Sequence, residues 1–156
     1  MNKKLILLIA VILSIPVIVF AQNKINNMQR IKRAQLMQKT LGQAQSLSLA
    51  IRQYSFDNKG NMPPMNNLTA LKQALKPYLG GSDFISAASG KPFIFNTKLS
   101  GKKLVDSNFI VWLYDPKPTS GPNNPKDLYR VVGYSNHFTT MPEKIWQSEK
   151  KTFGLP

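Results

Sequence analysis

The fold is decided by residues 41–63, LGQAQSLSLAIRQYSFDNKGNMP, where an amphipathic pattern ends in a turn. The pattern places apolar residues three and four positions apart, which marks one face of a helix. That face also extends upstream, and its members are Ile25, Met28, Ile31, Ala34, Met37, Leu41, Ala44, Leu47, Ile51 and Tyr54. Gly60 suits the position after a helix end, and Pro63-Pro64 prevents continuation. We therefore predict an amphipathic helical stalk over residues 22–60.

The two halves of this helix differ in polarity. After Leu41 the apolar face is continuous, and we expect it to pack against the rest of the domain. Residues 22–38 are too polar to be fully covered. Their basic cluster, Arg30-Ile31-Lys32-Arg33, has two interpretations. It is either a solvated face or a contact with lipid head groups next to a membrane.

Residues 1–21 read as a membrane-directed segment. Lys3 and Lys4 precede residues 5–21, from Leu5 to Ala21, which carry no charge. In one interpretation this is a cleaved signal peptide whose small-residue site lies just before Gln22. In the other it is a retained single-pass anchor in the inner membrane, since 17 helical residues span about 25 Å. Both interpretations put the C-terminal domain in the periplasm or outside the cell.

Residues 61–156 have the pattern of a small α+β head. Asn66-Asn67 supplies a cap for a short helix that ends before Pro77. Strands are predicted at 92–96, 109–114 and 129–135, a Pro-rich loop at 115–127, and a last short helix from Pro142 as its first residue. The predicted fold class is α+β: a long N-terminal helix, apolar anchor then amphipathic half, whose C-terminal half packs on a small antiparallel sheet.

Composition excludes several classes of protein. The chain has 156 residues, no Cys and one His, so a large multidomain enzyme, a disulfide scaffold and a multi-His or Cys-ligated metal centre are excluded. The net charge is +14. Residues 1–56 carry eight basic and no acidic side chains, whereas residues 57–156 carry thirteen basic and seven acidic ones. The basicity therefore points to a membrane-proximal stalk more than to nucleic acid.

No constellation of catalytic residues is visible. His137 has no carboxylate neighbour in the sequence, and no two acids share the spacing of a catalytic pair or a calcium loop. Ser89-Gly90-Lys91 lacks the spacing of a phosphate-binding loop. The aromatic residues near basic ones fit a core better than a stacking platform, and they are Tyr129, Tyr134, Phe138 and Trp146. We predict a non-enzymatic protein with no catalytic, cofactor-binding or metal-binding residues.

Five stretches in order resemble one family. Residues 51–63 are similar to its "L-x-x-Y-x-x-D-N-G-x-x-P" helix end, and Arg33-Ala34-Gln35 to the basic stretch upstream of that end. Residues 68–79 match its short helix ending in Tyr-Leu, residues 89–95 its "W-G-N-P-Y-x-Y", and residues 132–146 a C-terminal "F-A-D-G-H-V-x-x-x-P-E-E-x-W". The chain thus resembles the type IV pilin-like proteins, closest to the pseudopilins of type II secretion.

The resemblance implies a structural role. It implies a membrane-anchored, non-enzymatic subunit whose partners are inner-membrane lipid and, through the N-terminal helix, other pilin-like subunits. Two family features are missing: the Gly that prepilin peptidase recognises, and the Glu five residues into the mature helix. The alternative is therefore a basic extracytoplasmic module that binds an anionic polymer, DNA or acidic polysaccharide, and does not assemble into a filament.

Overall fold

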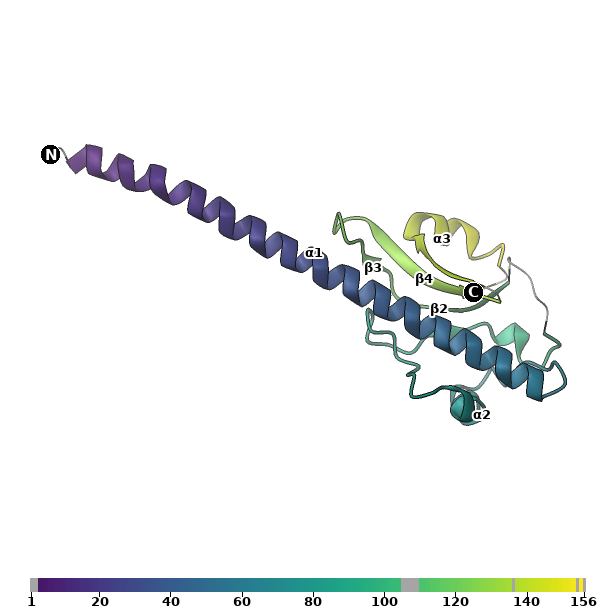
Figure 1. Cartoon of the computed structure of the whole chain (residues 1–156). Helices are drawn as coiled ribbons and strands as arrows, with labels where there is room; N and C mark the ends of the chain where they lie inside the picture. Colours follow the sequence, from purple (N-terminus) through teal and green to yellow (C-terminus); the bar gives the residue numbers. More distant parts are fainter. Residues whose placement is uncertain (1–2, 105–109, 136, 154, 156) are drawn as a thin grey trace.

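A long helix carries a small head on one half of its length (Figure 1). The computed structural model describes residues 3–104, 110–135, 137–153 and 155, with side chains from residue 22 onward. Helix α1 spans Lys3–Asp57, and the head packs along its C-terminal half while the N-terminal half projects away. The predicted anchor or signal segment, residues 1–21, lies outside the residues whose side chains are described. Among the described residues, none of the helices has the length and apolar character needed to cross a membrane.

Helix α1 ends in a turn built from left-handed backbone. Lys59 and Gly60 have φ of 55° and 79°. The Gly60 N–H donates to the Ser55 carbonyl at 2.7 Å, which satisfies one of the last carbonyls of the helix. The predicted helix stop is confirmed, although regular helix ends three residues before the predicted limit of the stalk.

The head consists of short elements in the order helix, strands, helix. Helix α2 spans Leu68–Leu75, and the Asn67 side chain caps it by accepting from two backbone N–H groups, as predicted. Single 3₁₀ turns follow at Lys76–Tyr78 and Thr97–Leu99. The strands are β1 Ile94–Phe95, β2 Val111–Tyr114, β3 Thr119–Ser120, β4 Leu128–Tyr134 and β5 Phe138–Pro142, and helix α3 is Glu143–Glu149.

The strands form one antiparallel sheet around β4. β2 pairs with the last three residues of β4, and β3 pairs with its first two. β5 pairs with β4 from Tyr129 to Gly133, so it lies along the opposite edge from β2 and β3. β1 extends the sheet beyond β2. The expected antiparallel sheet on the long helix is confirmed.

Three sequence predictions need correction in detail. The predicted loop 115–127 contains the short strand β3, and residues 138–142, not predicted as a strand, form β5. Both segments are held by pairing with β4 rather than by their own apolar pattern. Pro142 is the N-cap of α3 and not its first residue.

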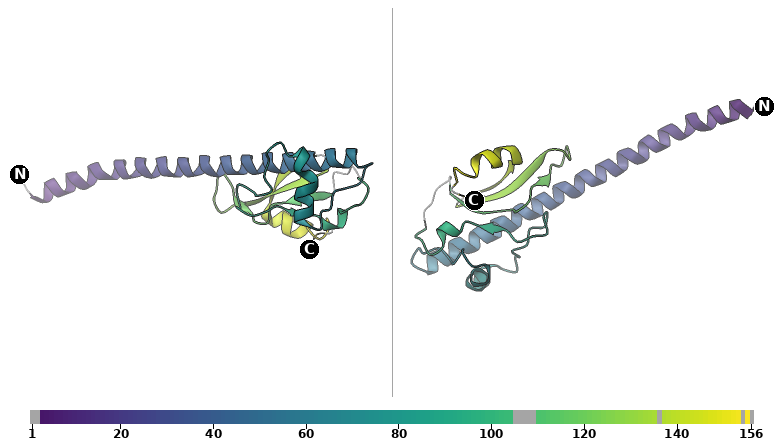
Figure 2. Two further views of the ribbon diagram at one scale, coloured as in Figure 1. Left: turned by 90° about the horizontal axis from the view of Figure 1, so that it is seen from below. Right: turned by 180° about the vertical axis from the view of Figure 1, so that it is seen from behind.

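Two layers of core lie on either side of the sheet. Helix α1 covers one face and α3 the other (Figure 2). The α1 layer joins buried residues of the helix to Trp112, Leu113 and Val131, and the α3 layer contains Val111, Tyr114, Val132, Tyr134, Trp146 and Leu155. A register shift between Val111 and Leu113 lets the adjacent residues Trp112 and Leu113 share the α1 layer.

Small residues allow α1 to approach the sheet closely. Ala44 and Ala50 are buried on the helix, and Gly133 faces it from β4. A Cβ added at Gly133 would lie 3.1 Å from Leu113 Cγ and 3.2 Å from Ser48 Oγ. There is therefore no room for a side chain at this position without moving the helix or the strand.

Gly133→Ala is expected to destabilise the head by about 1–3 kcal/mol, because it overpacks the helix–sheet contact. The measurement is urea unfolding of the full chain in detergent, followed by fluorescence of the buried Trp112 and Trp146. Gly42→Ala is the matched control. It lies within α1 with nothing near its added Cβ, so it should stabilise by about 0.5–1 kcal/mol. Equal effects of the two variants would contradict the packing described.

Candidate functional site: the projecting stalk and its joint with the head

The projecting stalk, residues 22–32, is exposed at every position. Three large apolar side chains on it are uncovered: Ile25 at 43%, Met28 at 50% and Ile31 at 53% exposure. Lys24, Arg30 and Lys32 are exposed beside them, and the stretch contains no acid. The prediction that residues 22–38 are not fully covered is confirmed: residues 22–32 are exposed, whereas Arg33 and Ala34 are half-buried and Met37 is buried. The apolar side chains are available to a partner or to lipid.

The joint between stalk and head begins at Arg33. Its Nε donates to the Gly121 carbonyl at 3.0 Å, and its Nη2 donates to the Pro122 carbonyl at 3.3 Å. The guanidinium fork therefore fixes the loop after β3 to the helix. Arg33 accordingly serves the head, which distinguishes it from Arg30 and Lys32 of the same basic cluster.

The next turns of α1 hold a second loop through hydrogen bonds to its backbone. The Thr40 hydroxyl donates to the Leu36 carbonyl and accepts from the Ala88 N–H at 3.0 Å. The Gln43 amide donates to the Ile85 carbonyl and accepts from the Ala87 N–H, both at 2.8 Å. Loop 85–88 is thus tied to the helix by paired donors and acceptors, and the Ser89-Gly90-Lys91 stretch is the turn that follows it.

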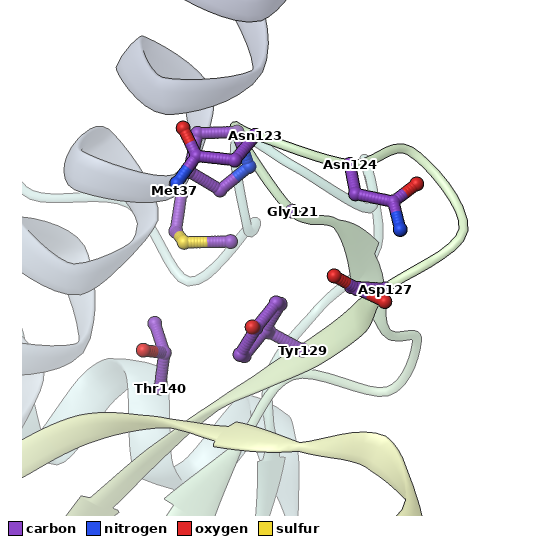
Figure 3. Close-up of a pocket in the computed structure, with 8 residues that line it drawn as sticks. Met37, Gly121, Asn123, Asn124, Asp127, Tyr129 and Thr140 are labelled. Atoms are coloured by element: carbon purple, nitrogen blue, oxygen red, sulfur yellow. The ribbon is translucent and has the colours of Figure 1, made fainter.

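A cavity of about 240 Å³ opens between α1 and the loop after β3 (Figure 3). Met37 comes from the helix, and Tyr129 and Thr140 come from the sheet. Asn124 and Asp127 lie along the loop side, where the Gly121 N–H donates to the Asp127 carbonyl at 2.6 Å. The lining of this cavity contains both polar and apolar groups. Within the described part of the chain, no group of three His, Cys, Asp or Glu side chains could hold a metal ion.

An ion pair between buried Arg130 and half-buried Glu143 holds α3 against the sheet. Arg130 donates from Nε and Nη2 to the two carboxylate oxygens of Glu143 at 2.9 and 2.7 Å, and from Nη1 to the Asp115 carbonyl at 2.6 Å. Its guanidinium also lies 5.5 Å from the Trp146 ring centroid. Asp115 also accepts a hydrogen bond at its side chain, because the Ser86 hydroxyl donates to its carboxylate. All three nitrogens of the Arg130 guanidinium are thus hydrogen-bonded within the head, so this side chain has a structural role.

The electrostatics of Glu143 follow from this pair. Burial raises the pKa of its carboxyl, but hydrogen bonds from Arg130 and Gln147, together with nearby positive charge, lower it more. The net pKa lies below its ordinary value. The ionised form is therefore stabilised in the folded state.

The structure brings some of the residues singled out in the sequence together and leaves others half-buried. The His137 ring stacks on Tyr134 with centroids 4.3 Å apart. Tyr134 and Trp146 are buried, as predicted, while Tyr129 and Phe138 are half-buried. Asp57 accepts a hydrogen bond from the Tyr78 hydroxyl at 2.8 Å, which ties the helix end to the turn after α2.

Sequence reasoning missed the Arg130–Glu143 pair and the Arg33 contact. A lone Arg inside an otherwise apolar strand was the signal for the first. No local signal existed for the second, because its partners are main-chain carbonyls 88 and 89 residues away.

Comparison of the chain with family models, curated proteins and solved structures finds no match.

Glu143→Gln is expected to lower the free energy of unfolding by about 3 kcal/mol at neutral pH, because it leaves the Arg130 charge buried without its counter-ion. A depressed folded pKa means that this contribution is present above the unfolded pKa of about 4.3 and is lost as the pH falls through the lower folded pKa. The variant's stability should therefore depend less on pH in the acid range. Urea unfolding as a function of pH measures both effects.

Glu149→Gln, an exposed change on the same helix, is the control and should stay within about 0.5 kcal/mol of the parent. An equal loss in both variants would show that α3 does not depend on the ion pair.

Proposed function

We propose that this chain is a non-enzymatic, membrane-anchored structural subunit of the pilin-like class, akin to a pseudopilin of a type II secretion or type IV pilus-like system. Its anchor is residues 1–21, retained in the inner membrane. Its head lies in the periplasm or outside the cell. The chain would act by packing, because its helix would contact lipid and neighbouring subunits.

One observation carries this proposal. The head covers α1 only from Arg33 onward, and the helix continues uncovered through residues 22–32 toward the uncharged stretch 5–21. Eleven helical residues correspond to about 16 Å. Ile25, Met28 and Ile31 follow one another at helical spacing on this bare stretch, and a row of exposed apolar side chains is typical of a surface that contacts a partner or a membrane. A stalk that stands off a membrane and meets other helices uses that length and those side chains.

The departures from the family also bear on the role. The chain lacks the Gly that prepilin peptidase recognises and the Glu five residues into the mature family helix, so the proposed subunit does not depend on the usual family processing.

Membrane fractionation tests the anchor. The full chain, produced in a bacterium with two membranes, should stay with the inner membrane after high-salt and alkaline washes. Leu13→Arg together with Ile9→Arg should release it or prevent insertion, since each Arg near the bilayer centre costs about 2.5–3.5 kcal/mol. Ile25→Arg, on the projecting stalk, is the matched control and should leave retention unchanged. Release of the parent by salt, or a mature chain beginning at Gln22, would disprove the anchor.

A second candidate function is favoured by the exposed cations of the helix. Lys24, Arg30, Lys32 and Lys39 are all exposed, and residues 22–56 carry no acid to neutralise them. We propose, as the alternative, that this surface binds an anionic polymer such as DNA or acidic polysaccharide, with the head as its carrier.

Salt dependence separates this alternative from the first. If the four cations contact phosphates, log affinity for duplex DNA should fall against log salt with a slope of about −3 to −4. Replacing Lys24 and Lys32 by Gln should make that slope shallower by about 2. The control is Lys144→Gln, because Lys144 is exposed on α3. Replacing Arg130 by Met would not be a suitable control, because Arg130 is buried and structural. No binding at low salt, or an unchanged slope, would remove this candidate.

A further inference from the structure

Two arginines lie one helical turn apart on α1 where the stalk meets the head, Arg30 and Arg33. Arg33 is half-buried, and its guanidinium donates to the carbonyls of Gly121 and Pro122. Neither arginine makes an ion pair within the described part of the chain. Two like charges one turn apart destabilise a helix, and a half-buried charge without a counter-ion adds to that cost. The pair therefore suits an anion that comes from outside the chain.

A cavity of about 390 Å³ lies between this side of α1 and the loop after β3. Both arginines line it, together with four carboxamides, which belong to Asn26, Asn27, Gln29 and Asn123. Figure 3 shows Asn123 on the loop, beside α1. None of the residues that line this cavity is acidic. It adjoins the cavity of Figure 3, because Asn123 borders both.

The fold leaves most polar groups of this cavity unused. Arg33 is fixed by its two bonds to the loop through Nε and Nη2, and within the described residues its Nη1 makes no hydrogen bond. Asn26 accepts from the Gln22 side chain at 3.2 Å, which leaves its amide N–H groups. The lining side chains without any hydrogen bond in the described part of the chain are Asn27, Gln29, Arg30 and Asn123. One guanidinium is thus held in place before a ligand binds, which lowers the ordering cost of binding.

We propose that this cavity binds a phosphate ester that also carries hydroxyl groups, as the head group of an anionic phospholipid does. Guanidinium groups pair with phosphate oxygens through two parallel hydrogen bonds. Carboxamides both donate and accept, which suits the hydroxyl groups of the same ligand. A soluble glycerol or sugar phosphate and a lipid head group share this chemistry.

The position of the cavity favours the lipid. Asn26 lies five residues beyond Ala21, the end of the uncharged stretch, which is about 8 Å along a helix. Side chains on a helix tilt toward its N-terminus, so Arg30 and Arg33 reach back toward that end. The head groups of a bilayer extend about 5–8 Å beyond the hydrocarbon on each side. The lipid source rests on the proposed anchor, whereas the affinity for a phosphate ester does not.

A fluorescent label beside the cavity measures binding. The chain has no Cys, so Lys126→Cys, exposed and next to Pro125 of the cavity wall, takes up a single label. The labelled full chain is kept in a neutral detergent while glycerol phosphate is added. We expect a saturable change in fluorescence with glycerol phosphate and none with glycerol. A change that does not saturate, or an equal change with glycerol, would overturn the proposal.

A second arm identifies the source of the phosphate. The same labelled chain is placed in phosphatidylcholine nanodiscs that contain a rising share of phosphatidylglycerol, or of phosphatidylserine, which has the same net charge. A saturable response that is larger for phosphatidylglycerol identifies the lipid head group, and a response to glycerol phosphate alone identifies a soluble ester. Equal responses to the two lipids would overturn the assignment to a lipid. No response in either arm would overturn the site. The detergent arm needs no anchor, so an anchor that fails in membrane fractionation leaves its result valid.

Arg30→Gln tests the site without disturbing the fold, because Arg30 makes no hydrogen bond or ion pair in the described part of the chain. It should weaken binding of the responding phosphate ester about tenfold or more, because charge-assisted hydrogen bonds are lost. Lys117→Gln is the matched control, since it removes the same charge from an exposed position outside the cavity. An equal loss in both variants would show that only the overall charge matters and would disprove the site.

Asn123→Ala tests the contribution of the head. Its carboxamide lies across the cavity from the helix, so its removal should also weaken binding, while urea unfolding of the variant should match that of the parent. Unchanged affinity would confine binding to the helix alone and would contradict a site built between the helix and the loop.

Discussion

The close contact between α1 and the sheet is the constraint on which the rest of the head depends. Ala44, Ala50 and Gly133 let the helix axis come near β4, so that Leu47 and Ile51 reach Trp112 and Leu113. The strands are short, with four to seven residues in β2, β4 and β5 and two in β1 and β3, and such a sheet does not hold together alone. Its stability comes from burial against a helix that is already straight and long.

The polar contacts around the apolar contact between α1 and the sheet share one feature. Arg33, Thr40 and Gln43 bind main-chain groups of two loops, not other side chains. Loops with few apolar residues expose backbone donors and acceptors, and each one buried against a helix needs a partner. Polar side chains of α1 that lie beside its apolar face supply those partners. Ser48 is the exception among these positions, because its hydroxyl is buried without a hydrogen-bond partner.

Much of the architecture could be predicted from the sequence, because its signals are local. The end of α1 at residues 57–60 and the Asn67 cap of α2 follow from the chemistry of single residues. Strand β5 could not be predicted, since Phe138–Pro142 is half-buried and ordered by its pairing with β4. The joint between stalk and head was also invisible, because Arg33 and its carbonyl partners are 88 and 89 positions apart and meet only through the fold.

The structure divides the basic residues of the helix into two groups with different uses. Arg33 and Arg52 donate to carbonyls of the head and belong to its architecture. Lys24, Arg30, Lys32 and Lys39 remain exposed along a stretch of the helix, residues 22–56, that contains no acid. Two such helices side by side would repel one another along this stretch, since no carboxylate is present to pair across the contact. In the proposed role, the exposed cations of this stretch would therefore be matched by negative charge, either on a partner helix or on an anionic lipid surface, rather than by a second copy in the same register.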